Sequence, residues 1–384
     1  MLHSQRHLFS LPEDLHYLNC AFKAPLLKPA EEAAIQALVR NRNPSTFTPQ
    51  DFFSNTAKTR DLFARLVNCA PEEVALIPSA SYGLASAINN IPHRPGSHAL
   101  TIQSEFPSGF FELQRWCGRH GAELKVVGPE EGLYPHGRNW NERILEAIWK
   151  DTAMVVMSSV HWMTGLKYDL EAIGQRCREV GACFVVDGSQ SVGAMPIDVR
   201  RFKIDALICP AYKWMLGPYS IGLAYLGASF DGGVPLEESW MNRTNAVEFA
   251  KLADYEEAYK PHAGRYNMGE SSNFVLVPML NAALEQLLEW GVGNVAAYAE
   301  GLGEPLRAYL RGLGVVLEED AYRASHLSGL RLPEGMDVAR LKERLAANGV
   351  NLSVRGDSLR VSIHAFNTAA DVAALVAAVG EAME

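Results

Sequence analysis

The feature that most constrains the fold is an alternation of short apolar runs with longer amphipathic segments. The runs are five to eight residues long, the usual length of buried strands, and helical patterns lie between several of them. This alternation predicts an α/β fold with a largely parallel sheet. The predicted strands are residues 74–78, 98–103, 123–128, 153–160, 182–188, 205–212 and 221–227.

The helical patterns and their interruptions define the rest of this region. Residues 169–181 place apolar side chains at helical spacing and end at Gly181, which predicts a helix stop. Residues 271–290 are predicted to form the longest helix, and GVGNVAA (291–297) is interpreted as a helix stop and restart rather than a dinucleotide-binding motif. Near 228–265 a polar segment rich in Gly and Pro predicts a long loop.

The C-terminal part of the chain predicts a smaller α+β unit. Its expected elements are helices near 295–312 and 336–349, strands near 327–332 and 358–363, and a terminal helix from Thr368. We therefore predict three parts: an N-terminal arm (1–25), a large cofactor-binding domain (26–290) and a small C-terminal domain (291–384).

Composition argues against several classes of protein. The net charge is -9 and no basic run is present, which is atypical of non-specific nucleic-acid binding. No apolar run reaches the ~18–20 residues that span a bilayer, and we expect no signal peptide, because the first residues lack its apolar core. The six cysteines form no CxxC and no metal-site spacing, which predicts reduced thiols, no metal site and a cytoplasmic location.

Asp187 and Lys213 are the most informative charged residues. Asp187 ends one predicted strand and Lys213 follows another, so both are expected at the sheet edge where ligands bind. Each alone is more often a solvated loop charge. Together they suit pyridoxal phosphate, because a lysine amine forms a Schiff base with a carbonyl and an aspartate keeps a ring nitrogen protonated.

The segment PSASYGLASAINN (78–90) follows a predicted strand and opens a helix at about Ser81. Helix amides and a small hydroxyl residue at such a start suit a phosphate group. The alternative is an ordinary serine N-cap, which this feature alone does not exclude.

Two longer motifs carry a family resemblance. They are FVVDGSQSVGAMPIDV (184–199) and AYKWMLGPYSIGLAYL (211–226), and the similarity runs from YLNCAFKAPL (17–26) to LRVSIHAFNTAADV (359–372). The chain resembles the class V aminotransferase family of fold-type I pyridoxal-phosphate enzymes. That family includes cysteine desulfurases, kynureninases, serine–glyoxylate aminotransferases and proteins similar to isopenicillin-N epimerase.

The resemblance implies roles for the residues around the cofactor. Lys213 would carry the Schiff base and shuttle the Cα proton, Asp187 would pair with the pyridine nitrogen, and Gln190 would bond the ring 3′-oxygen. Ala80 and Ser81 would cradle the phosphate.

Three further residues follow from the same resemblance. Phe106 would stack on the cofactor ring, Tyr212 would reach the phosphate, and His161 would lie beside the 3′-oxygen or the substrate. Without the resemblance, Phe106 would be read as a core aromatic and His161 as a structural histidine.

The implied substrate site lies nearer the two ends of the chain. Arg360 would bind the substrate α-carboxylate with help from Arg355, while Asn19 and Phe22 would line the entrance. The alternative is that the two arginines are surface charges. The family resemblance further implies a homodimer with shared active sites.

In that homodimer, Trp240 and Ser271 in the GESSN stretch (269–273) would face the partner's cofactor.

The chain also departs from the family pattern. Only GDSL separates Arg355 from Arg360, so the nucleophilic cysteine of desulfurases is missing. Pro210 replaces a phosphate-binding serine, and Glu270 replaces a Thr or Asn. We therefore expect an enzyme that acts at Cα of an amino acid, with transamination favoured and β-elimination, epimerisation or a non-catalytic role left open.

Overall fold

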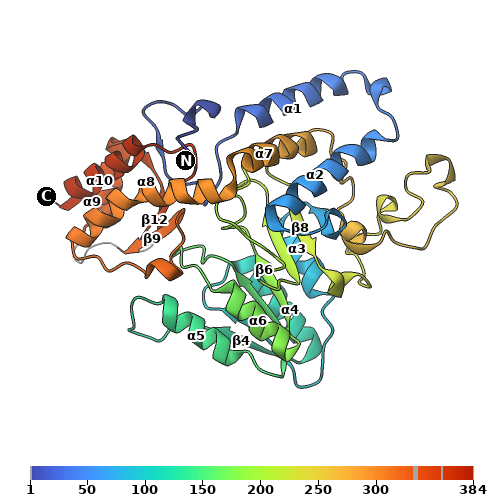
Figure 1. Ribbon diagram of the computed structural model, residues 1–384, viewed down its shortest axis with the longest axis horizontal. Helices are drawn as coiled ribbons and strands as arrows, with labels where there is room; N and C mark the ends of the chain where they lie inside the picture. Colours follow the sequence, from blue (N-terminus) through green and yellow to red (C-terminus); the bar gives the residue numbers. More distant parts are fainter. Residues whose placement is uncertain (1, 332–335, 356–357, 384) are drawn as a thin grey trace.

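The computed structural model describes residues 2–331, 336–355 and 358–383, and it does not describe the side chain of Arg355. Its centre is a sheet of seven strands in the order β2-β8-β7-β6-β5-β3-β4. Neighbours run parallel except where β8 pairs with β2 and β7, which confirms the predicted α/β fold with a mainly parallel sheet (Figure 1).

Every predicted strand of this sheet is present within two residues at either end. The strands are β2 (Val74–Ile77), β3 (His98–Ile102), β4 (Glu123–Val127), β5 (Thr152–Ser158), β6 (Cys183–Asp187), β7 (Ala206–Pro210) and β8 (Gly222–Leu226). All residues of β5 and β7 are buried, as is typical of strands with helices on both faces. Because side chains alternate along a strand, Val155 and Met157 join one hydrophobic cluster while Met154 and Val156 join the other.

Helices cover both faces of the sheet. The helices of this part are α1 (Lys28–Asn41), α2 (Asp51–Val67), α3 (Ala80–Ile88), α4 (Pro107–His120), α5 (Gly137–Ala147), α6 (Leu170–Val180) and α7 (Leu276–Trp290). Leu84 of α3 and Leu113 of α4 belong to one cluster, and α2, α5, α6 and α7 contribute to the other. Helix α1 packs along α7 (Figure 1).

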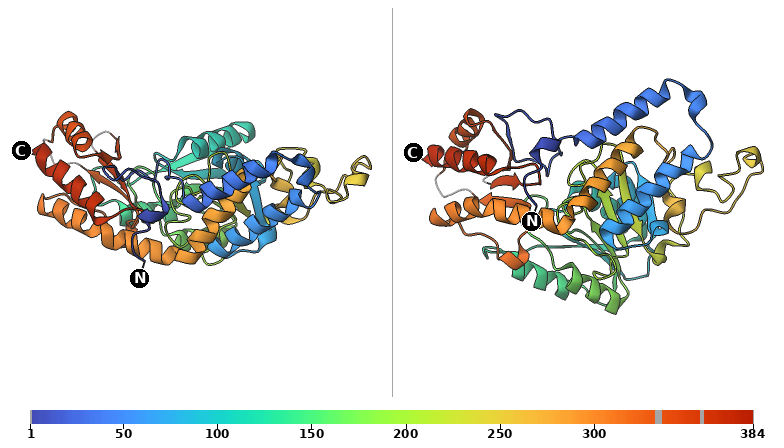
Figure 2. Two further views of the ribbon diagram at one scale, coloured as in Figure 1. Left: turned by 90° about the horizontal axis from the view of Figure 1, so that it is seen from above. Right: turned by 45° about the horizontal axis from the view of Figure 1, so that its top comes forward.

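The C-terminal part has its own small sheet and core. Its elements are α8 (Val292–Gly312), β9 (Leu327–Arg331), α9 (Val338–Ala347), β10 (Val350–Asn351), β11 (Ser353–Arg355), β12 (Ser358–Ser362) and α10 (Ala369–Met383). Strands β11, β12 and β9 pair antiparallel in that order, and a third hydrophobic cluster fills the space against α8, α9 and α10. In Figure 2 these helices lie at one end of the molecule and the loop around residue 250 projects at the other.

The N-terminal segment is attached to this C-terminal unit. Strand β1 (His16–Tyr17) pairs in parallel with β10, and Leu18 joins the third cluster. The domain limits 25/26 and 290/291 stay predictions, although α7 does end at Trp290.

One sequence prediction about helix length is wrong. Among the described residues the longest helix is α8, with 21 residues, whereas α7 has 15. Helix α7 begins only at Leu276, because the side chain of Asn273 accepts the backbone N–H groups of Val275 and Leu276 at 3.1 and 2.8 Å. Gly291 has a φ of 73° and separates the two helices, as the predicted stop and restart requires.

The predicted long loop is confirmed as a segment without long regular elements. Short 3₁₀ turns occur in it and elsewhere: Arg6–Leu8, Pro44–Thr46, Pro71–Glu73, Ala228–Phe230, Trp240–Asn242, Phe249–Lys251, His262–Tyr266 and Asp320–Tyr322. Within the described ranges, no helix has both the length and the apolar character needed to cross a membrane.

Candidate active site

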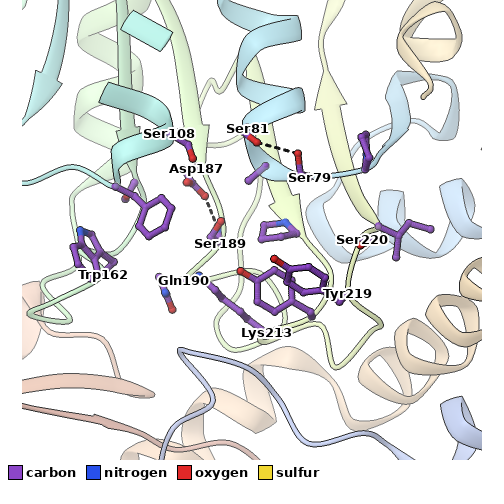
Figure 3. A pocket seen from close by; sticks show the side chains of 17 residues that line it. Ser79, Ser81, Ser108, Trp162, Asp187, Ser189, Gln190, Lys213, Tyr219 and Ser220 are labelled. Atoms are coloured by element: carbon purple, nitrogen blue, oxygen red, sulfur yellow. Dashed lines mark hydrogen bonds between the residues drawn. The ribbon is translucent and has the colours of Figure 1, made fainter. Parts of the chain in front are cut away.

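A cavity of about 320 Å³, here called the inner cavity, lies at the carboxyl ends of the parallel strands (Figure 3). Ser158 ends β5, Asp187 ends β6 and Pro210 ends β7, and all three line it. Ligands of open α/β sheets bind at this edge. Seven residues predicted from the sequence line the inner cavity: Ala80, Ser81, Phe106, Asp187, Gln190, Tyr212 and Lys213.

Asp187 is a buried carboxylate in the floor of the inner cavity. Its Oδ1 accepts the backbone N–H of Ser189 at 2.8 Å (Figure 3). Burial raises the pKa of Asp187, while its hydrogen bonds with Ser189 and the positive charge of Lys213 oppose that rise. A buried carboxylate is stable when a cation or a hydrogen-bond donor faces it, so this one is suited to a protonated ring nitrogen.

Lys213 enters the same cavity from the loop between β7 and β8. The residue is 8% exposed, and burial lowers the pKa of its amine, with Arg360 acting in the same direction and Asp187 against it. The Nζ atom lies 5.6 Å from the ring centroids of both Phe106 and Tyr212. A lowered pKa leaves more of the amine neutral, and a neutral amine is the nucleophile that attacks carbonyl groups.

The start of α3 provides small polar groups at another wall. Ser79 is the N-cap, since its Oγ accepts the N–H of Tyr82 at 3.2 Å, and its Oγ lies 3.0 Å from that of Ser81. The helix begins at Ala80, one residue before the predicted start. Because Ser79 caps the helix, the hydroxyl of Ser81 stays available beside the first helical N–H groups.

Gln190 is held by two hydrogen bonds. Its Oε1 accepts the indole N–H of Trp214 at 2.8 Å, and its Nε2 donates to the carbonyl of Ala21 at 3.2 Å. The side-chain amide carries two N–H groups, so one more donor remains for the predicted contact with a ring oxygen.

A second cavity of about 570 Å³, here called the outer cavity, shares several lining residues with the inner one and adds Phe22 and Arg360. Arg360 is 3% exposed, and its guanidinium donates to the carbonyl of Trp162 at 3.3 Å and to Ser353 Oγ at 3.2 Å. Arg360 lies close enough to Lys213 to lower the pKa of its amine. The outer cavity therefore places a fixed guanidinium near the lysine.

Asn19 is linked to Arg360 through Ser353. Its Oδ1 accepts the hydroxyl of Ser353 at 2.9 Å, and its Nδ2 donates to Asn351 at 3.2 Å. It lines neither cavity, so its geometry is that of a residue that positions Ser353 and, through it, Arg360.

Besides Asn19, three further predicted residues lie outside both cavities. His161 is buried, its Nδ1 lies 2.9 Å from Thr164 Oγ1, and burial lowers its pKa to about 4. Trp240 is 41% exposed, and the backbone carbonyl of Ser271 accepts the hydroxyl of Thr56 at 3.3 Å. The roles of His161, Trp240 and Ser271 stay predictions.

Arg355 is only partly described. Its backbone pairs with Ser358 in the small sheet, and its side chain lies outside the described parts of the chain. Its predicted help to Arg360 stays a prediction. Glu270, the other departure noted in the sequence, is exposed and lines neither cavity.

Sequence reasoning missed Glu105, a buried carboxyl group beside the site. It accepts the backbone N–H groups of Phe106 and Ser158, each at 2.6 Å, and also the hydroxyl of Ser158. Burial, reinforced by the charge of Asp187, raises the pKa of Glu105 to about 7. The only signal in the sequence was the position of Glu105 directly before Phe106. In the structure, Ser104 of the same segment has a φ of 55°.

Sequence reasoning also missed several polar groups of the inner cavity. These are Ser79, Ser108, Ser158, Ser189, Tyr219 and Ser220. Isolated serines have no periodicity or spacing in the sequence that distinguishes them from ordinary surface serines. They can be identified as cavity residues only in the folded structure.

The residues present fit pyridoxal 5′-phosphate. Asp187 supplies a buried carboxylate for a ring nitrogen, Lys213 an amine for the carbonyl carbon, and Ser81 a hydroxyl at a helix start for the phosphate. The exposed fraction of Phe106, 39% although it lines both cavities, leaves a ring face free to cover a planar cofactor.

Comparison with known proteins gives a family match over most of the chain. The Aminotransferase class-V family matches residues 37–375. An uncharacterized protein, C11D3.10 of Schizosaccharomyces pombe, is 26% identical over 377 residues and covers 93% of this chain and 81% of its own. The uncharacterized aminotransferase YcbU of Bacillus subtilis is 25% identical over 333 residues, with 83% and 81% covered.

Solved structures show the same fold. The apo cysteine desulfurase of Thermococcus onnurineus superimposes with a TM-score of 0.80 at 18% identity, covering 98% of this chain and 97% of that one. A lysine-to-alanine mutant of C-DES, with glycine covalently linked to the PLP cofactor, gives a TM-score of 0.84 at 19% identity, with 98% of both chains covered.

Proposed function

Because the chain belongs to the Aminotransferase class-V family and is a pyridoxal-phosphate-dependent enzyme, we propose that it transfers the amino group of an α-amino acid. The observation that carries the proposal is that Lys213 lines both cavities, together with Asp187 in the inner one and Arg360 in the outer one, and that both charges act on its amine. An α-amino acid needs this order of groups, because its amino nitrogen and its carboxylate must be held at the same time.

Four residues would hold the cofactor. Asp187 would face the ring nitrogen, Gln190 a ring oxygen, Phe106 the ring face and Ser81 the phosphate. When bound, pyridoxal phosphate supplies an electrophilic carbonyl carbon and a ring that withdraws electrons from a bond at the substrate Cα.

The chain's own residues then perform three tasks. The Lys213 Nζ, whose pKa is lowered by burial, takes a proton from Cα and holds it for return. Arg360 binds the substrate carboxylate with a guanidinium already fixed by Trp162 and Ser353. Phe106 keeps water from one side of the reacting atoms.

Support for transamination comes from what this reaction needs. It requires one group that moves a proton, and Lys213 can fill that role alone. Among the described residues that line the two cavities, none is a cysteine or a histidine, so a persulfide-forming thiol has no counterpart there. The relative YcbU, which is named as an aminotransferase, supports the same choice.

The test is a spectral screen of the purified holoenzyme with L- and D-amino acids and no added 2-oxo acid. Transamination predicts loss of the visible absorbance of the bound cofactor with one equivalent of 2-oxo acid formed. A band that recovers while pyruvate, sulfide or anthranilate accumulates would identify a β-lyase instead. A band that recovers with only inverted substrate would identify an epimerase, and no response to any amino acid would favour a non-catalytic protein.

We also propose a cytoplasmic homodimer with shared active sites. The six cysteines form no disulfide, which is usual in reducing compartments. Trp240 lines neither cavity and is 41% exposed, which suits an apolar surface covered by a second subunit. Light scattering tests the dimer, and a fully active monomer would contradict it.

A further inference from the structure

The outer cavity has an unusual balance of groups. Of the described residues that line it, five are aromatic, three are cationic and none is acidic. An amino acid whose amino and carboxyl groups meet Lys213 and Arg360 leaves only its side chain to contact the rest of this lining. The lining of the outer cavity therefore determines which substrate side chains can bind.

Trp162 forms one wall of the outer cavity. Its indole N–H donates to the carbonyl of Ser104 at 2.8 Å, and its ring contacts Phe106 edge-on with centroids 5.6 Å apart. The carbonyl of Trp162 also accepts Arg360 Nη1 at 3.3 Å. One residue thus orients the carboxylate-binding group and, since its only polar side-chain atom is already bonded, offers an apolar ring face beside it.

The opposite wall is also aromatic and is tied to the lysine loop. The rings of Tyr212 and Tyr219 lie 4.7 Å apart, and the loop that carries Phe22 is fixed by a hydrogen bond from Ala24 N to the carbonyl of Tyr212 at 2.9 Å. Phe22 and Tyr219 remain more than half exposed. A planar side chain bound between these rings would remove their apolar surface from water.

We propose that the substrate is an α-amino acid with a planar aromatic side chain, which contacts Trp162 and Phe22 of the outer cavity. This inference rests on the proposed function, because it takes Lys213 and Arg360 as the groups that hold the amino acid.

The test uses carboxylates that lack an α-amino group and therefore bind without reacting. Calorimetry of the holoenzyme compares 3-phenylpropanoate with butanoate, glutarate and 6-aminohexanoate. We expect 3-phenylpropanoate to bind about ten-fold more tightly than butanoate, glutarate or 6-aminohexanoate. Equal affinities, or a preference for glutarate or 6-aminohexanoate, would overturn the inference.

Two variants test which residues of the outer cavity cause the preference for 3-phenylpropanoate. Trp162→Ala should reduce the ratio of phenylpropanoate to butanoate affinity to about three-fold or less, and Phe22→Ala should reduce it to a smaller extent. Phe111→Ala is the matched control, because Phe111 is an exposed ring (61%) that lines neither cavity. A ratio unchanged in both Trp162→Ala and Phe22→Ala would overturn the assignment.

Failure of the two proposals can be told apart. A strong preference for 3-phenylpropanoate with no reaction of any amino acid would contradict transamination alone. Reaction with small amino acids and no preference among the carboxylates would contradict the aromatic substrate alone.

Discussion

The two cavities of the site are built in different ways. The inner cavity is lined by residues at the ends of neighbouring buried strands, so Asp187 and Lys213 are placed by the sheet itself. The outer cavity joins Phe22 of the N-terminal segment, Trp162 of the loop after β5 and Arg360 of the C-terminal sheet. Its geometry depends on contacts between parts of the chain that lie far apart in the sequence.

This difference has a consequence for function. A sheet edge gives a rigid frame for the common cofactor chemistry, whereas loops and a separate unit can change without disturbing that frame. We therefore expect changes in the inner cavity to affect the reaction itself and changes in the outer cavity to affect substrate binding.

The largest effect is expected from Lys213→Ala. Removing the amine deletes both the nucleophile and the proton shuttle, so turnover should fall about a thousand-fold or more. Borohydride should fix the cofactor to the wild-type protein and not to the variant, as mass spectrometry can show. Lys23→Ala is the control, and cofactor fixation that persists in Lys213→Ala would refute the assignment of the lysine.

Glu105→Gln should alter stability in a pH-dependent way. The pKa of Glu105 is raised from 4.5 to about 7 in the folded protein, so the folded chain binds more protons than the unfolded chain between these values. The stability contributed by the protonated group is full below about pH 4.5 and is lost as pH rises to about 7. At 1.36 kcal/mol per pKa unit the loss is about 3 kcal/mol.

The measurement is urea unfolding of the cofactor-free protein at about pH 5 and about pH 7.5. Glu105→Gln cannot ionise, so the free energy of unfolding of the wild type should fall by about 2 kcal/mol more than that of the variant, because part of the contribution is already lost at about pH 5. Glu31→Gln, at an exposed glutamate of α1, should follow the wild type. Parallel pH profiles for wild type and Glu105→Gln would show that the carboxyl group does not titrate in this range.

Arg360→Ala should act chiefly on substrate binding in the outer cavity. Loss of a charged hydrogen bond to the substrate carboxylate, about 2 kcal/mol, should raise KM about 30-fold with a smaller change in kcat. Arg360→Lys should recover part of the loss, since a single ammonium cannot replace the guanidinium fork. A fall in kcat with an unchanged KM would place Arg360 with the inner cavity and contradict the comparison.

The sequence predicted the inner cavity better than the outer one for a physical reason. Apolar runs locate buried strands, and a charged residue at a strand end is visible in the sequence, as for Asp187. Glu105 was missed because its partners, Ser158 and the N–H of Phe106, come together only in the folded chain. The hydrogen bond from Arg360 to the carbonyl of Trp162 was missed for the same reason, since it joins residues 198 positions apart.

Helix limits show the same weakness of local patterns. The prediction that 271–290 would be the longest helix failed because the apolar periodicity does not reveal that the side chain of Asn273 accepts the N–H groups of Val275 and Leu276, where the helix begins. Conversely, the start of α3 was predicted to within one residue, but its N-cap and its phosphate-facing residue could not be told apart.

Two variants at the start of α3 distinguish the N-cap residue from the phosphate-facing residue. Their expected effects on stability and cofactor affinity are the smallest of those predicted. Ser79→Ala removes the N-cap bond to Tyr82 and should lower the free energy of unfolding by about 1 kcal/mol. Ser81→Ala removes no cap, so stability should be nearly unchanged, while cofactor affinity should fall a few-fold if its hydroxyl faces the phosphate. Unfolding curves and cofactor titrations of both variants separate the two roles. If Ser81→Ala leaves cofactor affinity unchanged and Ser79→Ala alone reduces both quantities, the helix start contributes to the inner cavity only through its cap.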